Sequence, residues 1–123
     1  TEIRSHLSER LQACVAAGVA KAQVLIDPGI GFGKTLAHNL ALLRGLPALA
    51  SLGSPLLVGT SRKRFLGELT GSPVEDRDPV SATAAALSVA FGAHVVRVHD
   101  VAAAVDSVRV ADAIAKAPYP RLR

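Results

Sequence analysis

A glycine-rich segment is the first part of the sequence that could do chemistry. It runs from Asp27 to Thr35, reads DPGIGFGKT and contains three glycines. These glycines permit left-handed turns and close backbone approach to a flat ligand, which a turn that only caps the next helix would not need. The ending Gly-Lys-Thr suggests a P-loop, but that pattern requires glycine at position 28, where the chain has proline. We therefore predict a ligand-binding loop.

Asp27 is the candidate polar contact of this loop. As a buried carboxylate it would accept hydrogen bonds from the amino and ring N–H donors of a ligand. A turn or capping aspartate with no ligand is the alternative, and the spacing of the segment leaves both open.

Three consecutive cations form the second segment. Arg62, Lys63 and Arg64 lie in the sequence GTSRKR, which directly follows an apolar run. A solvated basic loop is the simpler interpretation, but the position at the end of a predicted strand favours a binding site. At most two of the three cations can point into such a site.

Arginine and histidine alternate in the third segment, which reads RVHD at residues 97–100. Because side chains alternate along a strand, Arg97 and His99 project to the same side. Together they could clamp an anion, with Arg97 offering a fork of donors and His99 a single donor. The sequence leaves open that His99 is a core histidine and that Arg97 pairs with Asp100.

The hydrophobic pattern predicts the elements that position these segments. Short apolar runs at 24–26, 55–58 and 94–98 are typical of buried strands, and His94 is expected to be structural. Gly45 and Pro47 are expected to close the second helix, Asp78 to cap an alanine-rich helix and Asp100 to cap the last helix. Helical spacing predicts helices over 3–15, 36–46, 62–69, 80–91 and a final segment with Val101, Val105, Val108 and Ala111 on one face.

Helices that alternate with continuous apolar strands indicate an α/β fold with a parallel sheet. Residues 27, 63 and 97, at the polar strand ends, are separated by 36 and 34 positions. This is close to the ~31 residues per unit of an eight-unit barrel of ~250 residues. Three units would form only the final arc of such a barrel, and a doubly wound sheet is the main alternative. In both folds ligands bind at the carboxyl ends of the strands.

Composition limits the partners of the chain. The 123 residues carry 14 basic and 10 acidic side chains, and this excess of positive charge suits an anionic ligand. Nucleic acid is disfavoured because three Phe and one Tyr are too few for base stacking. No apolar run reaches the ~18 residues of a membrane span. A small phosphorylated ligand is the partner that we expect.

Cysteine and methionine usage gives two further expectations. The single Cys14 can form no internal disulfide, which fits a cytoplasmic setting, and its place in an apolar stripe predicts a buried structural thiol. The chain contains no Met, so we expect a piece of a longer gene product. His, Cys and carboxylate residues show no metal-ligand spacing.

Three long segments resemble signatures of the dihydropteroate synthase family. They are Leu25–Lys34, Pro55–Gly67 and Gly92–Val101, and they occur in the order and spacing of that family. The resemblance covers essentially the whole chain. It implies the C-terminal arc of a (β/α)8 TIM barrel, with about strands 6–8 and their flanking helices. Residues 1–123 would be the C-terminal portion of a single pterin-binding TIM-barrel domain.

The resemblance also implies a reaction. The family condenses 6-hydroxymethyl-7,8-dihydropterin diphosphate with p-aminobenzoate to give 7,8-dihydropteroate and diphosphate in folate biosynthesis. Family roles carried onto this sequence make Asp27 and Lys63 catalytic, and they give a substrate-binding set of Asp27, Phe32, Gly59, Lys63, Arg97 and His99. Asp27 would hold the amino-pyrimidine edge and Lys63 the pterin ring.

Other family roles complete the site. Phe32 would be an apolar wall of the aminobenzoate pocket, and Arg97 and His99 would bind the diphosphate. No metal ligand is expected in these residues, because the family's Mg²⁺ and diphosphate loop belongs to the N-terminal half. The resemblance therefore implies activity, sulfonamide binding and a homodimer for the full-length enzyme only. A pterin-dependent methyltransferase and a non-enzymatic half-barrel are the alternative hypotheses.

Overall fold

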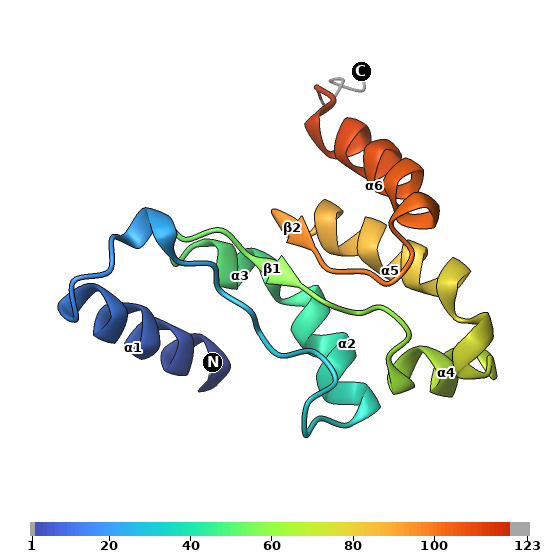
Figure 1. Cartoon of the computed structure of the whole chain (residues 1–123), viewed down its shortest axis with the longest axis horizontal. Coiled ribbons are helices and arrows are strands. Elements are labelled where there is room, and N and C mark those ends of the chain that lie inside the picture. Colours follow the sequence, from blue (N-terminus) through green and yellow to red (C-terminus); the bar gives the residue numbers. More distant parts are fainter. Residues whose placement is uncertain (1, 119–123) are drawn as a thin grey trace, which may run out of the picture.

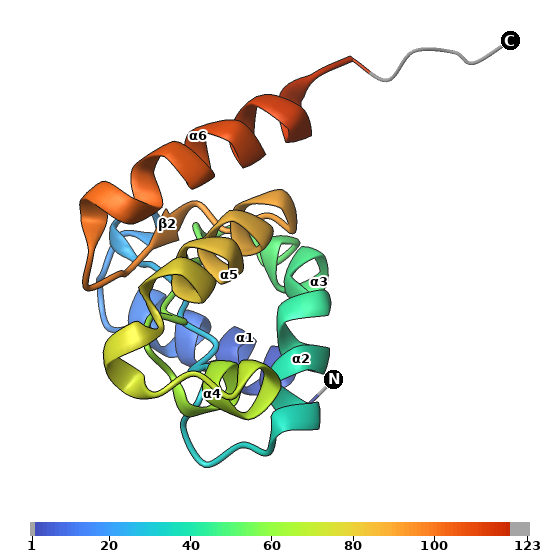
Figure 2. The ribbon, with the colours of Figure 1, turned by 90° about the vertical axis from the view of Figure 1, so that its right-hand side faces the viewer.

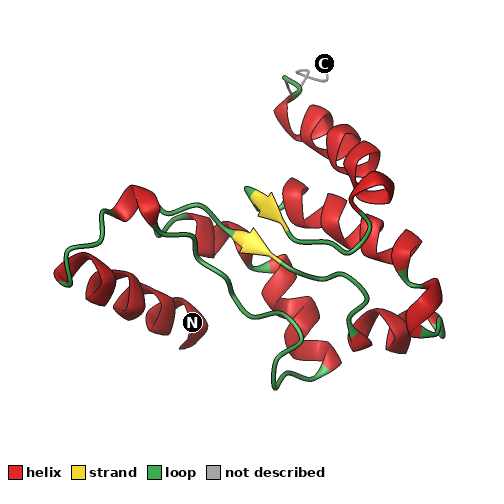
Figure 3. Ribbon diagram, viewed as in Figure 1, coloured by secondary structure: helices red, strands yellow, loops and turns green. Residues whose placement is uncertain are grey.

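The computed structural model describes residues 2–118 and shows an α/β chain in which helices flank short parallel strands (Figures 1 and 3). The α/β class predicted from the alternation of elements is therefore confirmed. Residues 1 and 119–123 of the predicted domain lie outside the described residues. The elements are α1 Glu2–Ala16, the 3-10 helix η1 Lys21–Gln23, α2 Leu36–Arg44, α3 Leu46–Ala50, β1 Leu57–Val58, α4 Arg64–Thr70, the 3-10 helix η2 Val74–Asp76, α5 Asp78–Ala90, β2 Val95–Val96 and α6 Val101–Lys116.

Three extended segments run side by side in chain order through the middle of the molecule (Figure 1). β1 pairs in parallel with β2 in the register Leu57 to Val95, and Ile26 forms a parallel bridge with Leu56. All three predicted strands are found in place, but each is shorter than its apolar run. The first is reduced to one bridge because Pro28, soon after it, has no N–H to donate to a ladder. The carboxyl ends of all three segments therefore meet at one edge.

The core lies between these segments and the helices that cover them. Leu56 and Val58 are at most 1% exposed, as is Leu46 at the start of α3. His94 contributes to this framework, because its Nδ1 accepts a hydrogen bond of 3.1 Å from the backbone N–H of Leu56. The structural role predicted for His94 is confirmed. The other members of the core cluster are Leu11, Ile26, Ile30, Leu49, Phe65, Leu66, Ala84 and Ala93.

Two predicted helix boundaries are wrong. Gly45 does end α2, but Pro47 lies in the first turn of a second helix, α3, instead of closing the first. Proline is tolerated there because the N–H groups of a first helical turn have no intrahelical acceptor. Asp78 is the first residue of α5 and makes no capping hydrogen bond. Its carboxylate instead pairs with Arg62, which lies 16 residues earlier.

The terminal helices α1 and α6 are the most exposed. α6 packs along α5 (Figure 2), and its predicted cap is confirmed because Asp100 Oδ1 accepts from Ala103 N at 3.0 Å. Val101 of the predicted apolar face is 61% exposed, whereas the other three members of that face are half-buried. Cys14 on α1 is also half-buried, so the expectation of a buried thiol is wrong. No helix between residues 2 and 118 has the length and apolar character needed to cross a membrane.

Candidate active site

The carboxyl ends of the three parallel segments bring Asp27, Gly59 and Arg97 together. Asp27 follows the bridge at Ile26, Gly59 follows β1, and Arg97 follows β2. Arg97 Nη2 lies 3.7 Å from Asp27 Oδ2, and a Cβ added at Gly59 would lie 2.9 Å from the same nitrogen. Gly59 therefore leaves the space that the Arg97 guanidinium fills.

The Asp27–Arg97 pair is open to solvent. The Asp27 side chain is 37% exposed and that of Arg97 is 59% exposed, so the expectation of a buried carboxylate is wrong. Asp27 Oδ1 accepts a 2.8 Å hydrogen bond from the N–H of Gly29, which leaves Oδ2 facing the guanidinium. An exposed ion pair contributes roughly 0–1 kcal/mol. A ligand can therefore replace this contact at small cost.

The glycine-rich segment wraps around the Lys63 side chain. Gly29, Gly31 and Gly33 have φ values of +70°, +84° and +60°, which only glycine adopts easily. A Cβ added at Gly31 would lie 2.5 Å from Lys63 Cδ. Glycine is thus required at position 31 for two reasons, the left-handed backbone and the close approach of Lys63.

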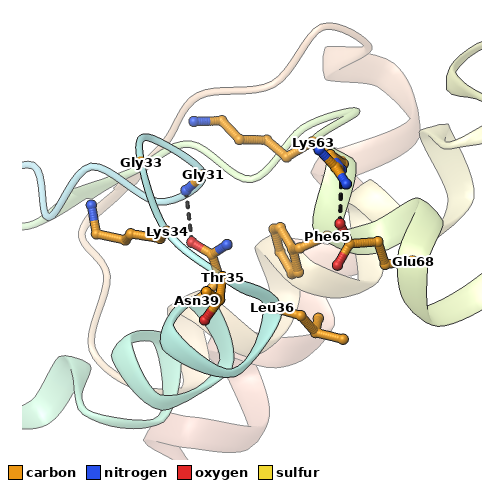
Figure 4. A pocket seen from close by; sticks show the side chains of 10 residues that line it. Gly31, Gly33, Lys34, Thr35, Leu36, Asn39, Lys63, Phe65 and Glu68 are labelled. Carbon is orange, nitrogen blue, oxygen red and sulfur yellow. Dashed lines mark hydrogen bonds and ion pairs between the residues drawn. The ribbon is translucent and has the colours of Figure 1, made fainter.

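Side chains from α2 and from the segment itself hold this loop in one shape. Asn39 on α2 is only 3% exposed, and its Oδ1 accepts from Gly31 N at 2.8 Å (Figure 4). Lys34 Nζ donates to the Gly29 carbonyl at 2.7 Å and to the Phe32 carbonyl at 3.1 Å. The segment is therefore more than a cap for α2, although Thr35 also caps that helix through the N–H of His38.

Removal of the Asn39 amide is expected to destabilise this loop. Asn39→Ala removes the acceptor of the Gly31 N–H, and a hydrogen bond of this kind contributes about 0.5–1.5 kcal/mol to the unfolding free energy. Urea denaturation measures this loss. The matched control is His38→Ala, because the neighbouring His38 side chain is exposed. An equal loss in both variants would contradict the structural role given to Asn39.

Lys63 lies between the glycine loop and an aromatic ring. Its Nζ donates to the Ile30 carbonyl and is 4.2 Å from the centroid of the Phe32 ring. Burial lowers the pKa of Lys63 below its ordinary value, and the positive charge of Arg97 lowers it further, against an opposing effect of Asp27. The Phe32 ring itself is 67% exposed. A flat ligand can therefore rest on the ring beside a cation that is poorly solvated.

His99 is oriented by Ser61. The backbone N–H of His99 donates to Ser61 Oγ at 3.0 Å, and the same oxygen lies 2.8 Å from the ring nitrogen Nδ1 of His99. Because Ser61 Oγ already accepts from the backbone, we assign its proton to the bond with Nδ1. Nε2 then carries the ring proton and is free to donate to an anion. Ser61 is buried and His99 is exposed, so the alternative of a core histidine is not supported.

Only Lys63 of the three consecutive cations faces the glycine loop. Arg62 makes a two-point contact with Asp78, with N···O distances of 2.8 and 2.9 Å. Arg64 pairs with Glu68 on the same helix at 2.8 Å. The prediction that at most two of the cations point into the site is confirmed. Asp100 caps α6 and does not pair with Arg97, which excludes the alternative partner left open by the sequence.

A cavity of about 630 Å³ adjoins this surface between the glycine loop and α4 (Figure 4). Gly31 and Lys63 form the boundary shared by the cavity and the open strand ends. The cavity wall is polar and apolar in about equal parts, with Phe65 and Leu36 among its apolar side chains. A two-part ligand could therefore place one ring near Asp27 and extend past Lys63.

The site contains no cluster of three or more His, Cys, Asp and Glu residues among positions 2–118. Asn39 and Ser61 are the residues that sequence reasoning gave no role. Both act on partners in other segments, and Ser61 is 38 residues from His99. The only local signal for Asn39 was that a polar residue stands at helical spacing from Leu36 and Leu43, on the apolar face of the predicted helix.

The sequence of this chain is similar to that of known proteins of one family. Residues 1–99 match the family described as pterin binding enzyme. A dihydropteroate synthase of Neisseria meningitidis serogroup B is 49% identical over 117 residues, which are 92% of this chain and 41% of that protein. The chain thus spans about two fifths of the length of the curated relatives that it matches.

Solved structures give the same result. A dihydropteroate synthase of Coxiella burnetii in complex with pteroic acid superposes with a TM-score of 0.92 and 34% identity, covering 94% of this chain and 44% of that one. A Xanthomonas albilineans dihydropteroate synthase in complex with 7,8-dihydropteroate gives a TM-score of 0.90 and 48% identity, covering 95% of this chain and 45% of that one.

Proposed function

Because the chain belongs to the family of pterin binding enzymes, we propose that it is the C-terminal part of a dihydropteroate synthase. The full-length enzyme condenses 6-hydroxymethyl-7,8-dihydropterin diphosphate with p-aminobenzoate, and it releases 7,8-dihydropteroate and diphosphate. The family resemblance of the three sequence signatures is confirmed by the identity of 49% to a curated relative.

The observation that carries this proposal is the convergence of one carboxylate, one stacked lysine and two anion donors at the strand ends. Asp27 is held near Arg97, and Lys63 lies against the Phe32 ring. His99 presents a ring donor through its contact with Ser61. A pterin diphosphate needs this combination, because its base has N–H donors and its leaving group is an anion.

Each residue has a proposed role. Asp27 accepts hydrogen bonds from the amino-pyrimidine edge, and Lys63 contacts the pterin ring and borders the aminobenzoate pocket. Phe32 supplies an apolar wall, which its 67% exposure leaves available. Arg97, with the room given by Gly59, binds the diphosphate together with His99.

The reaction follows from these positions. The bond between the pterin methylene and the diphosphate oxygen breaks, and its electron pair leaves with the diphosphate. Positive charge then develops at the methylene and spreads by conjugation into the pterin ring, where the Asp27 carboxylate at the amino-pyrimidine edge stabilises it, while Arg97 and His99 stabilise the departing anion. The aromatic amine forms the new carbon–nitrogen bond and loses its proton to water. The residues of this chain bind and orient, and none forms a covalent intermediate.

Magnesium does not fit the residues of this chain alone. Positions 2–118 hold no cluster of three or more metal-ligating side chains, and both Asp27 oxygens face donors of the protein. We propose that the Mg²⁺ ligands lie in the N-terminal part of the full-length enzyme, where the ion would offset diphosphate charge.

The place of this chain in the full-length enzyme is part of the proposal. We assign its three extended segments to strands 6–8 of a TIM barrel and residues 1–123 to the C-terminal portion of that single domain. Sequential parallel pairing and the relatives of about twice this length support this assignment. Homodimerisation, sulfonamide binding and a cytoplasmic location are proposed for the full-length enzyme on family grounds.

The test is product formation by the full-length protein. With the dihydropterin diphosphate, p-aminobenzoate and Mg²⁺, we expect 7,8-dihydropteroate, detected by chromatography. Calorimetric titration with methyl-tetrahydrofolate tests the methyltransferase hypothesis, which needs no diphosphate clamp. The synthase assignment would be rejected if turnover released no diphosphate, or if the protein bound methyl-tetrahydrofolate in preference to the dihydropterin diphosphate. A protein that binds pterin but forms no product would support the non-enzymatic hypothesis.

Gly59→Ala is expected to weaken anion binding with little loss of stability. The added methyl would displace the end of the flexible Arg97 side chain, which lies 2.9 Å from the new atom. We expect the Kd for inorganic diphosphate to rise about tenfold, since a hydrogen bond to a charged group contributes about 1.5–3 kcal/mol. Calorimetry measures this change. In an Arg97→Ala background, Gly59→Ala should have no further effect, and an additive loss would contradict the role of Gly59.

A further inference from the structure

Arg62 has an unusual backbone conformation directly beside the candidate site. It is the only residue other than glycine with a positive φ, +57°, among positions 2–118. This left-handed region is disfavoured for residues with a side chain because Cβ crowds the following carbonyl. Such a conformation persists only when its surroundings determine it, and it is common at functional sites.

Contacts from the start of α5 hold Arg62 in this conformation. Its N–H donates to Ser81 Oγ at 2.8 Å, and Ser81 is only 3% exposed. Its guanidinium donates to both carboxylate oxygens of Asp78, at 2.8 and 2.9 Å. Its carbonyl accepts from Arg77 Nη1 at 3.2 Å. The N–H, the carbonyl and the side chain of Arg62 are therefore all engaged.

Arg77 is itself fixed between two elements. Its Nε donates to the Ser72 carbonyl at 3.0 Å, and its guanidinium occupies the space where Gly67 of α4 lacks a side chain. A Cβ at Gly67 would overlap that guanidinium. Through Arg77, the segment 71–77 thus contacts both α4 and Arg62.

The two neighbours of Arg62 along the chain are residues of the candidate site. Ser61 orients His99 through two hydrogen bonds, and Lys63 reaches the Ile30 carbonyl and the Phe32 ring. A change in the backbone at Arg62 would rotate both side chains, because they lie on either side of it. Neither Asp78 nor Ser81 hydrogen-bonds to Ser61 or Lys63, and both reach these two side chains through their contacts with Arg62.

We propose that Arg62, clamped by Asp78, Ser81 and Arg77, is a positioning residue that sets Ser61 and Lys63 for substrate binding and turnover. The inference rests on the proposed function of the Lys63 site, and it concerns residues to which that function assigned no role. Through these contacts, the position of the first turn of α5 determines the backbone conformation of Arg62 and so the positions of Ser61 and Lys63. The clamping residues do not touch the substrate.

The test uses the full-length enzyme and variants that leave Ser61 and Lys63 in place. Asp78→Asn removes the charged partner of the Arg62 guanidinium, and Ser81→Ala removes the acceptor of the Arg62 N–H. Their matched controls are Asp106→Asn, from the exposed Arg109–Asp106 pair on α6, and Ser88→Ala, whose buried hydroxyl bonds only within α5. The readouts are kcat/KM, the Kd for inorganic diphosphate and the melting temperature, with kinetics at least ~15 °C below the lowest melting temperature.

We expect Asp78→Asn and Ser81→Ala to lower kcat/KM about tenfold and to weaken diphosphate binding, since small misplacements of reacting groups have large effects on rate. The controls should stay within about twofold of wild type in kcat/KM, whatever their melting temperatures. Equal kinetic effects in a variant and its control would show a role in stability alone and would overturn the proposal.

Substitution of Arg62 itself separates backbone conformation from side chain. Arg62→Gly and Arg62→Ala both lose the guanidinium, but only glycine adopts the left-handed backbone without strain. We expect Arg62→Gly to retain about fivefold more kcat/KM than Arg62→Ala. The reverse order would overturn the proposal. A wild-type enzyme that forms no product would instead remove the proposed function, and with it this inference.

Discussion

Asp27→Asn is expected to lower kcat/KM about 10²–10³-fold while the protein stays folded. The asparagine Oδ1 can still accept from the Gly29 N–H, which Asp27 Oδ1 does at 2.8 Å. The lost pair with Arg97 is exposed and contributes no more than about 1 kcal/mol to stability. What disappears is the negative charge, which in the proposed reaction stabilises the cation that develops at the pterin methylene.

Steady-state kinetics and urea denaturation of the full-length enzyme measure these two effects. Asp106→Asn is the matched control, because its carboxylate is 88% exposed in a surface pair on α6. We expect that control to retain full activity. A loss of less than about threefold in Asp27→Asn would contradict the assignment of Asp27 as the charge-stabilising group, because one preorganised group is worth far more.

The parts of this site that the sequence predicts are those that a strand presents at its end. Asp27, Lys63 and Arg97 each follow an apolar run, and parallel strands carry such residues to one edge. The convergence of the three segments therefore follows from the alternation of elements. The short pairing of the strands does not, because apolar runs indicate burial and not the number of ladder hydrogen bonds.

Contacts between distant segments are the parts that the sequence does not reveal. The Ser61–His99 bond joins residues 38 positions apart, and the Arg62–Asp78 pair joins residues 16 apart. Asp78 before Pro79 is a strong local signal for a helix cap. The charge of Arg62 competes for the same carboxylate and wins, because a two-point charge-assisted contact is stronger than one capping hydrogen bond. Local preference was overridden by tertiary structure.

The role of Lys63 connects the chemistry of the site with its electrostatics. Burial lowers the pKa of Lys63, and the charge of Arg97 lowers it further, so the folded protein holds this proton less tightly than the unfolded chain. The site thus keeps two cations close together at a cost in stability. An anionic ligand removes this cost, because its negative charge favours the protonated amine.

Lys63→Met is expected to lower kcat/KM about 10²–10³-fold, since the variant loses a charged donor at the proposed pterin site. The matched control is Lys116→Met, because Lys116 is 75% exposed and pairs only with Asp112. We expect no kinetic change in that control. A Lys63→Met enzyme with near-normal kcat/KM would place the pterin contact elsewhere.

The same variant makes a second prediction, about stability against pH. Between the lowered pKa of Lys63 and its ordinary value of 10.5, the unfolded chain binds more protons than the folded protein. The contribution of Lys63 to the unfolding free energy therefore rises as the pH rises through this window. Urea denaturation from pH 7 to 10.5 should show the stability of wild type increasing relative to Lys63→Met, with no such trend relative to Lys116→Met. A constant difference would mean that Lys63 is as well solvated in the folded protein as in the unfolded chain.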